Sequence, residues 1–312
     1  MSPTARSPEE LKAAWMKIRT EQGVNTQRDG AAMLGVPEAV LQNACTGPTA
    51  VRLRPQYGDI LKAARDLGRL MTLVRNDHLV AMPVGSFDEV TIDGTKGRAH
   101  GGTVDIHFDF SRFGSVFALT DESKGAVRRS LYFFDDCGAA ALKALLWSKE
   151  GDDAFEAIVE RFREPAPGDV VTAPKSKEDW RSAKEFASGR SVEDKAQDRA
   201  IALIQAVIDH EINVDWRIPA RATEERYSGP LRNLRKREDS EGWYDVNYPH
   251  FNTHLAVCNI ARLASVNDPK SGAPAVALID GADMLICRIA LAADNSPKAK
   301  DAWTAAVSDA VR

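Results

Sequence analysis

Two stretches of equal length and similar pattern constrain the fold of this chain more than any other feature. The first stretch runs from Val104 to Asp121 and the second from Phe251 to Asp268. Each has histidine at its fourth place, His107 and His254, and each ends on an aspartate that lies four residues before a glycine. Self-similarity of this kind is typical of repeated structural units. The chain is therefore predicted to contain one fold twice.

The order of the predicted elements agrees with a repeat. The first half reads as helix, antiparallel strands between residues 69 and 136, and a closing helix at 152–162. The second half begins with a helix at 194–210, continues with strands that include one over 253–266, and ends in a helix at 298–311. Helix, strands and helix are thus followed by the same series.

The predicted fold class is α+β, a tandem repeat of two similar domains, each a large antiparallel sheet flanked by helices. Residues 1–165 are predicted to form the N-terminal repeat and residues 177–312 the C-terminal repeat, joined by a Pro-rich linker at 166–176. Within this scheme 104–121 is expected to be equivalent to 251–268.

Composition and charge exclude several classes of protein. The chain has 312 residues and a formal net charge of −4, whereas a generic binder of nucleic acid or anionic membrane needs a basic surplus. The four cysteines contain no CxxC pair, which argues against a zinc site and a disulfide framework. The N-terminus lacks the apolar core of a signal peptide, and no apolar run is long enough for a membrane span. The cytoplasm is the expected location, without membrane insertion.

The segment "LGVP" at residues 34–37 breaks a helical region in the manner of a helix-turn-helix. Such a motif would place its second helix in a DNA groove. The stretch 37–44, which would be that recognition helix, contains neither Arg nor Lys. A packed helical pair that supports the domain is therefore the favoured interpretation, and a DNA-binding regulator the least favoured one.

Several segments carry a resemblance to a known family. "RDGAAMLGVPEAVL", "VRLRP" and "RRSLYFFDDCG" in the first half, and "YSGPLRNL", "FNTHL" and the terminal "DAW" in the second, resemble the HemS-type bacterial haem-utilisation proteins, or haemin-degrading factors. The resemblance covers nearly the whole chain and is thinner over residues 174–226. It implies a cytosolic protein of two α+β repeats that receives haem, or a related tetrapyrrole, and passes it on or helps to degrade it.

The resemblance also implies where haem would be held, and there this chain departs from the family. The family's iron donor is a histidine between the repeats, but residues 177–198 contain none. The family's distal arginine falls on His107, and its Tyr-x-x-Arg pair falls on Ala264 and Asn267. A basic residue after the "SGP" turn persists as Arg235. The haem site is therefore expected to be altered, with hemin bound no better than micromolar.

Three residues are the candidates for the altered site. Haem iron takes an axial donor such as His, and its propionates favour Arg or Lys. His210 is the first candidate for the iron ligand, since it lies at the end of the helix that enters the second repeat; the alternative is a helix-terminal histidine favoured by the helix dipole. His107 is the second candidate, with a structural sheet histidine as its alternative. Arg235 is the candidate partner of a propionate.

The leading functional hypothesis is a haem-handling protein for iron acquisition. The main alternative is a non-haem paralogue that uses the scaffold as a binding or interaction module. The sequence contains no GxSxG, HExxH or P-loop motif, and the pair Asp135–Asp136 is expected in a hairpin turn. No enzyme is indicated, and haem degradation would be the reaction if there is one. Whether two copies form a homodimer is left open.

Overall fold

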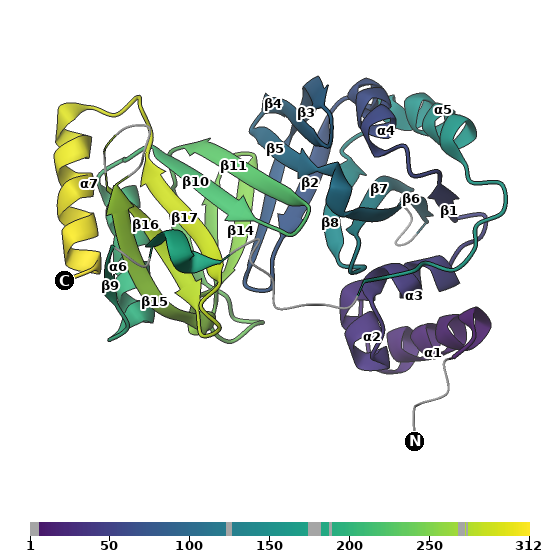
Figure 1. Cartoon of the computed structure of the whole chain (residues 1–312), viewed down its shortest axis with the longest axis horizontal. Helices are drawn as coiled ribbons and strands as arrows, with labels where there is room; N and C mark the ends of the chain where they lie inside the picture. Colours follow the sequence, from purple (N-terminus) through teal and green to yellow (C-terminus); the bar gives the residue numbers. More distant parts are fainter. Residues whose placement is uncertain (1–5, 123–126, 174–181, 187–188, 268–271, 273) are drawn as a thin grey trace. The chain divides into compact units, whose positions relative to one another are not determined.

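The computed structural model in Figure 1 describes residues 6–122, 127–173, 182–186, 189–267, 272 and 274–312. The chain divides into two compact units. Unit 1 comprises residues 1–70, 92–97 and 109–176, and unit 2 comprises residues 71–91, 98–108 and 177–312. Within the described ranges, no helix is both long enough and apolar enough to cross a lipid bilayer.

The helices are α1 (Pro8–Glu21), α2 (Gln27–Leu34), α3 (Glu38–Ala44), α4 (Tyr57–Ala63), α5 (Asp152–Phe162), α6 (Ala196–Asp209) and α7 (Pro297–Ala310). Short 3-10 turns are η1 (Ala64–Leu67), η2 (Phe110–Arg112), η4 (Lys149–Gly151), η6 (Ala183–Phe186) and η7 (Val257–Asn259). The strands are β1 (Ala50–Leu53), β2 (Leu70–Arg75), β3 (Leu79–Asp93), β4 (Lys96–Gly102), β5 (Val104–Asp109), β6 (Phe113–Asp121), β7 (Arg128–Asp135), β8 (Ala140–Leu146), β9 (Arg190–Val192), β10 (Val214–Pro219), β11 (Thr223–Gly229), β12 (Asn233–Lys236), β13 (Trp243–Tyr248), β14 (Phe251–Ala256), β15 (Ile260–Asn267), β16 (Pro274–Asp280) and β17 (Leu285–Leu291).

The N-terminal helix α1 begins directly after Ser7, which caps it. The Ser7 hydroxyl accepts the Glu10 N–H at 3.2 Å, and the Glu10 carboxylate accepts the Ser7 N–H at 2.8 Å, which together form a capping box. Pro8 at the first helical position loses no hydrogen bond there. Helix α1 then buries Leu11 and Trp15 against α2 and α3.

Helix α3, which a helix-turn-helix would present to DNA, is mostly buried inside unit 1. Ala39 packs in an apolar cluster with Phe117 and Phe134. The Glu38 carboxylate, itself buried, accepts a hydrogen bond from Lys143 at 2.7 Å. This arrangement supports the interpretation of a packed helical pair, because a recognition helix needs an exposed face.

Unit 1 contains an antiparallel sheet with the spatial order β1, β6, β7 and β8. Aromatic side chains project from both faces of this sheet and are buried on each face. Phe117 and Phe134 meet edge to face at 5.7 Å on the side of α3. Phe113 and Phe133 form a second edge-to-face pair at 6.0 Å, and the Phe113 ring also contacts Tyr57 of α4.

Unit 2 contains two groups of antiparallel strands. One follows the order β9, β15, β16, β17, β10, β11 and β5. The other follows the order β12, β13, β14 and β3. Helices α6 and α7 pack against the first group (Figure 1), and the Trp303 indole, fully buried, donates to the Pro274 carbonyl at 2.7 Å.

The two equivalent stretches form the same series of elements. Residues 104–121 form β5, η2 and β6, and residues 251–267 form β14, η7 and β15. Both second strands have a register shift near their start, between Phe113 and Ser115 in one and between Ile260 and Arg262 in the other. Residue 268 and the glycine at 125 lie outside the described residues, whereas Gly272 has the positive φ of a turn. The α+β tandem repeat predicted from the sequence is confirmed.

The sequence interpretation of residues 253–266 as one strand is wrong. The 3-10 turn η7 interrupts it, because the chain here leaves the group of β12 to β14 and enters the group of β15 to β17. The predicted repeat boundaries, 1–165 and 177–312 with a linker at 166–176, stay a prediction. The compact units are not contiguous in sequence, since residues 71–91 and 98–108 belong to unit 2.

Asn76 holds three segments of unit 2 together. Its buried amide donates to the Pro219 carbonyl at 2.9 Å and to the Ile286 carbonyl at 2.8 Å. Its side-chain oxygen accepts the N–H groups of His78 and Leu79, each at 3.0 Å. Removing this side chain leaves several backbone groups without a partner in a dry environment.

We therefore expect Asn76→Ala to lower the free energy of unfolding by at least about 3 kcal/mol, since each orphaned buried group costs ~1–3 kcal/mol. Urea unfolding measures the difference. Asn233→Ala, at an exposed position of β12, is the matched control and should change stability by less than about 0.5 kcal/mol. Equal effects of the two substitutions would contradict this account of Asn76.

Candidate functional site

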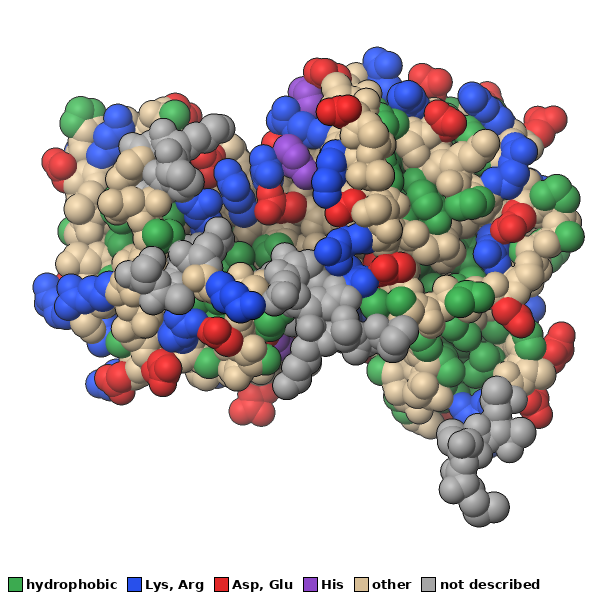
Figure 2. Space-filling view, in the orientation of Figure 1, with side chains coloured by type: hydrophobic (Ala, Val, Ile, Leu, Met, Phe, Trp, Pro, Cys, Tyr) green, Lys and Arg blue, Asp and Glu red, His purple; other side chains and the backbone are tan. Residues whose placement is uncertain are grey.

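A polar pocket in unit 2 is the candidate site. Strands β4, β5, β10 and β11 surround a cavity of about 430 Å³. Its lining residues are Arg98, His100, Gly102, Thr103, Val104, Asp105, His107, Asp215, Trp216, Arg217, Arg226, Tyr227 and Ser228. In Figure 2, Arg, Lys and His side chains gather with some acidic ones over the region of β4 and β5. The cavity is thus rich in cationic and titratable groups.

Strand register places three arginines side by side next to this cavity. Arg217 of β10 lies directly across from Arg226 of β11 and directly across from Arg288 of β17. Residues that pair across antiparallel strands point to the same face of the sheet. Like charges at such positions repel one another, so this row is unfavourable unless anions lie close to it.

The arginines of this row differ in how well they are neutralised. The Arg226 guanidinium contacts the Glu224 carboxylate, two residues away on the same strand. The Arg217 side chain forms no hydrogen bond or ion pair in the part of the chain that the structure describes, and it lines the cavity. The Arg217 guanidinium is therefore a donor of positive charge and hydrogen bonds to a ligand in the pocket.

His107 brings an imidazole to the same pocket. It lies on β5 directly across from Glu224 of β11, on the face that also carries Arg226. Its Nε2 atom is buried, lies 3.4 Å from an Asp105 carboxylate oxygen, and has no hydrogen-bond partner among the described residues. A buried ring nitrogen whose contact with a carboxylate is this long is poorly satisfied and is therefore a candidate for binding a ligand.

Asp105 and Arg98 form an ion pair among the residues that line the pocket. The Arg98 guanidinium donates to both Asp105 carboxylate oxygens, at 2.6 and 3.0 Å. Burial by itself raises the pKa of Asp105, but His107 and Arg98 beside it lower the pKa to about 2. Asp105 is therefore ionised at neutral pH and neutralises Arg98, which leaves Arg217 as the guanidinium available to a ligand.

Glu225 is a fully buried carboxyl group in contact with the backbone of Asp105, which lines the pocket. Its Oε1 atom accepts the Asp105 N–H at 3.2 Å, and its Oε2 atom has no partner among the described residues. Burial, together with the nearby Asp105 charge, raises the pKa of Glu225 well above its ordinary value. The surroundings of Glu225 therefore favour its neutral, protonated form.

The structure places the three candidates from the sequence at different locations. His107 lines the pocket. His210 is the exposed C-terminal residue that caps α6, and it is not among the lining residues. Arg235 lies on β12, its side chain 77% exposed, and pairs with Asp245 at 3.0 Å. Their roles in haem binding stay predictions.

Sequence reasoning missed Arg98, Arg217 and Arg226, and it gave His100 no role. The sequence does contain a signal for Arg217 and Arg226. A tight turn between β10 and β11 pairs Arg217 with Arg226, so counting outwards from that turn would have placed the two arginines opposite each other. Arg98 and His100 lie on β4, a strand that the sequence analysis did not predict, so no register was available for them.

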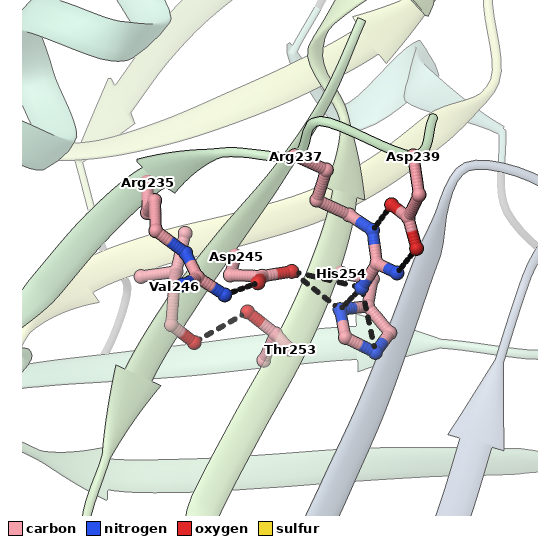
Figure 3. A network of polar contacts seen from close by, with 7 residues as sticks. All are labelled: Arg235, Arg237, Asp239, Asp245, Val246, Thr253 and His254. Atoms are coloured by element: carbon pink, nitrogen blue, oxygen red, sulfur yellow. Dashed lines mark hydrogen bonds and ion pairs between the residues drawn. The ribbon is translucent and has the colours of Figure 1, made fainter. Parts of the chain in front are cut away.

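A second polar network lies on β12, β13 and β14 (Figure 3). The buried Asp245 carboxylate accepts hydrogen bonds from Arg235 at 3.0 Å, Arg237 at 3.1 Å and the His254 Nδ1 atom at 2.7 Å. Arg237 also pairs with Asp239 through two contacts of 2.9 and 2.7 Å. Burial raises the pKa of Asp245, but these three donors lower it overall.

The acidic turn after β7 serves the backbone, as the sequence predicts. One Asp135 carboxylate oxygen accepts the N–H groups of Cys137 at 3.0 Å and Ala139 at 2.8 Å. Asp280 makes the equivalent bonds to Ala282 and Met284 at the β16–β17 turn, both at 2.9 Å. Asp135, Asp136 and Cys137 lie close enough to share a metal ion, but the Asp135 carboxylate is already used by the turn.

The buried carboxyl group predicts a pH dependence of stability. The pKa of Glu225 is raised in the folded state. Its contribution to the free energy of unfolding is therefore most favourable below the unfolded pKa and is lost as pH rises towards the folded pKa. Glu225→Gln carries a neutral side chain of the same shape, so this variant does not lose stability in that way as pH rises. Relative to the native protein, this variant should gain up to about 1.4 kcal/mol per pH unit as pH rises from the unfolded pKa of a glutamate towards the raised folded pKa.

Urea unfolding at several pH values measures this difference. Glu241→Gln, at an exposed position, is the matched control and should track the native protein at every pH. A constant difference between Glu225→Gln and the native protein across that range would mean that Glu225 is ionised in the folded state.

Comparison with known proteins finds similarity to bacterial proteins that are described as handling haem. Residues 35–162 match the family described as the haemin-degrading HemS.ChuX domain. The hemin transport protein HmuS of Yersinia pestis is 28% identical over 153 residues, which is 49% of this chain and 44% of that protein. The hemin transport protein HemS of Yersinia enterocolitica is 26% identical over 149 residues, 47% of this chain and 43% of that protein. These sequence matches thus span less than half of either relative.

Solved structures match over most of the chain. The haem-binding protein PhuS of Pseudomonas aeruginosa superposes with a TM-score of 0.79 and 27% identity, over 94% of this chain and 95% of that chain. The haem-degrading enzyme ChuS of Escherichia coli superposes with a TM-score of 0.85 over 98% of this chain and 100% of that chain; at 18% identity it shows the shared fold. The resemblance to the HemS-type haem-utilisation family is therefore confirmed, with a HemS/ChuX domain at residues 35–162.

Proposed function

We propose that this chain is a haem-handling protein and that it holds haem in the pocket between β4, β5, β10 and β11. His107 is the proposed iron ligand, and Arg217 and Arg226 are the proposed partners of the propionates. The observation that carries this proposal is that two groups face one cavity: a buried His107 Nε2 atom with a long, 3.4 Å contact to Asp105, and an Arg217 guanidinium that has no described partner.

The chemistry of these residues fits haem. Haem presents a metal that accepts an imidazole nitrogen and two carboxylates that favour bidentate pairing with guanidinium groups. The row of Arg288, Arg217 and Arg226 is repulsive by itself, so two carboxylates beside it relieve that repulsion. Bound haem supplies redox-active iron, and the task of these side chains is to hold and orient it.

The relatives support the same ligand class. PhuS, which is similar to this chain over almost its whole length, is described as a haem-binding protein, and the Yersinia relatives are described as hemin transport proteins. The role proposed here is therefore binding and transfer of haem in the cytoplasm during iron acquisition. Degradation of haem, which the description of ChuS names, stays an open alternative for this chain.

We propose further that the haem site differs from that of the family. Ala264, where the resemblance puts a tyrosine, is fully buried in an apolar cluster with Ala183, Ala277 and Ile279. Asn267, where it puts an arginine, is exposed at the end of β15. With these polar contacts absent, hemin is expected to bind with a Kd no lower than about 1 µM.

The arginine row also favours a second candidate, a module that binds a different organic anion without iron. Such a ligand would use Arg217 and Arg226 but would not need the His107 nitrogen. The first test below separates the two candidates, because only haem gives an iron–imidazole spectrum.

His107→Ala is expected to weaken hemin binding at the pocket by about tenfold or more, because an interaction worth ~1.5–3 kcal/mol is lost. A Soret-band titration of native and variant proteins measures the half-saturation point. His210→Ala, an exposed histidine outside the pocket, is the matched control and should bind hemin like the native protein. Loss of binding in His210→Ala with unchanged binding in His107→Ala would overturn the proposed ligand.

Arg217→Gln tests the propionate contact. The variant should bind hemin about tenfold more weakly than the native protein, whereas Arg19→Gln, an exposed position on α1, should have no effect. Hemin dimethyl ester, which lacks the propionate charges, should bind the native protein and Arg217→Gln equally. An equal loss with hemin and with its ester would show that Arg217 does not act through the propionates.

A further inference from the structure

The pocket lies where the pairing of β5 with β11 stops. This ladder begins at the pair Phe108–Thr223 and ends at the pair Ile106–Glu225, the last one between these strands in the described chain. Continued in the same register, the ladder would join Asp105 with Arg226, Val104 with Tyr227, and Thr103 with Ser228. All of these residues line the cavity instead. The cavity is thus bounded by the stretches of β5 and β11 that stay apart.

Continued pairing of the two strands would be favourable by itself. It would place the Asp105 carboxylate directly across from the Arg226 guanidinium, and opposite charges at such positions stabilise antiparallel strands. It would also pair the backbone groups of both strands within the sheet. In the structure Asp105 bonds to Arg98 of β4, and Arg226 contacts Glu224 of its own strand. Some feature of the fold must therefore keep the strands apart.

The Glu225 side chain occupies the end of the ladder. Its Oε1 atom accepts the Asp105 N–H at 3.2 Å. In a continued antiparallel ladder that N–H would donate to a backbone carbonyl of β11. Because a side chain of β11 already satisfies this donor, the backbone of β11 is kept away from Asp105.

Stability alone does not account for a carboxyl group at this place. Glu225 lies in one cross-strand row between Ile106 and Ile218, and all three side chains are fully buried. The Glu225 Oε2 atom has no hydrogen-bond partner among the described residues, and a buried polar atom without a partner is costly. An apolar side chain would fit this row at a lower cost. Glu225 is thus locally unfavourable, as residues that serve a site often are.

The other end of the open stretch is held by a separate contact. The Thr103 hydroxyl donates to the carbonyl of His250 at 2.8 Å and to the carbonyl of Val84 at 3.1 Å. Val84 belongs to β3, and His250 directly precedes β14. These bonds hold the residue before β5 away from β11, so the open stretch is fixed at both of its ends.

We infer that Glu225 is the positioning residue of the pocket: by accepting the Asp105 N–H it stops the β5–β11 ladder and keeps open the space beside His107, Arg217 and Arg226. Glu225 is not itself a lining residue and acts through the backbone of Asp105. Its effect on the shape of the pocket follows from strand register, whereas its consequence for hemin rests on the proposed function.

Glu225→Met tests this role, because methionine keeps an unbranched side chain of similar length but lacks the oxygen acceptor. The ladder should then extend, so amide hydrogen exchange at 103–105 and 226–228 should slow by about tenfold or more. Hemin should bind this variant about tenfold more weakly than the native protein, as measured by a Soret-band titration. The urea midpoint should be no lower than that of the native protein, since the buried row becomes fully apolar.

Glu225→Gln is the conservative variant that should restore the native behaviour. Its amide oxygen can accept the Asp105 N–H, so both the exchange at 103–105 and 226–228 and the hemin affinity should match the native protein. Glu241→Met, at an exposed position, is the matched control for the methionine substitution and should also behave like the native protein.

The exchange data and the hemin data decide different statements. Unchanged or faster exchange at 103–105 and 226–228 in Glu225→Met, or slowed exchange in Glu225→Gln as well, would overturn the positioning role. If exchange slows only in Glu225→Met while its hemin binding stays native, the role stands and the proposed haem pocket is wrong. If the native protein binds no hemin, the proposed function is wrong, and the exchange data still decide the role of Glu225.

Discussion

The pairing of β5 with β11 is the interaction on which the candidate site depends. It aligns His107 with Glu224, and the next pairing, β11 with β10, aligns Arg226 with Arg217. Because antiparallel partners share a face, these registers bring an imidazole and two guanidinium groups from distant parts of the sequence to one cavity. A shift of one residue in either pairing would turn these side chains to the opposite face.

The same type of pairing recurs between β14 and β3, but the charges around the histidine are different. Beside His107, the Asp105 carboxylate is paired with Arg98, and the Arg217 guanidinium has no described partner. Beside His254, two arginines and two aspartates balance one another, and the carboxylate of Asp245 holds the imidazole directly. One scaffold therefore carries a cationic pocket with a partly buried imidazole and an exposed imidazole in a neutral network.

The sequence was sufficient for the features that depend on local pattern. The Ser7 cap, the turn at Asp135 and the repeat of 104–121 follow from residue types and spacing, and the structure contains them. The pocket was harder to predict from the sequence, because it depends on strand register. The row of Arg217, Arg226 and Arg288 is visible only when β10, β11 and β17 are aligned, and the available guanidinium of Arg217 follows from contacts that its neighbours make elsewhere.

The central claim is that the pocket holds haem through His107, and a crystal structure of the protein with bound hemin tests it most directly. The account predicts iron bonded to the Nε2 atom of His107 and propionates against Arg217 and Arg226. Iron bonded to His210, or hemin bound only outside the pocket formed by β4, β5, β10 and β11, would contradict it.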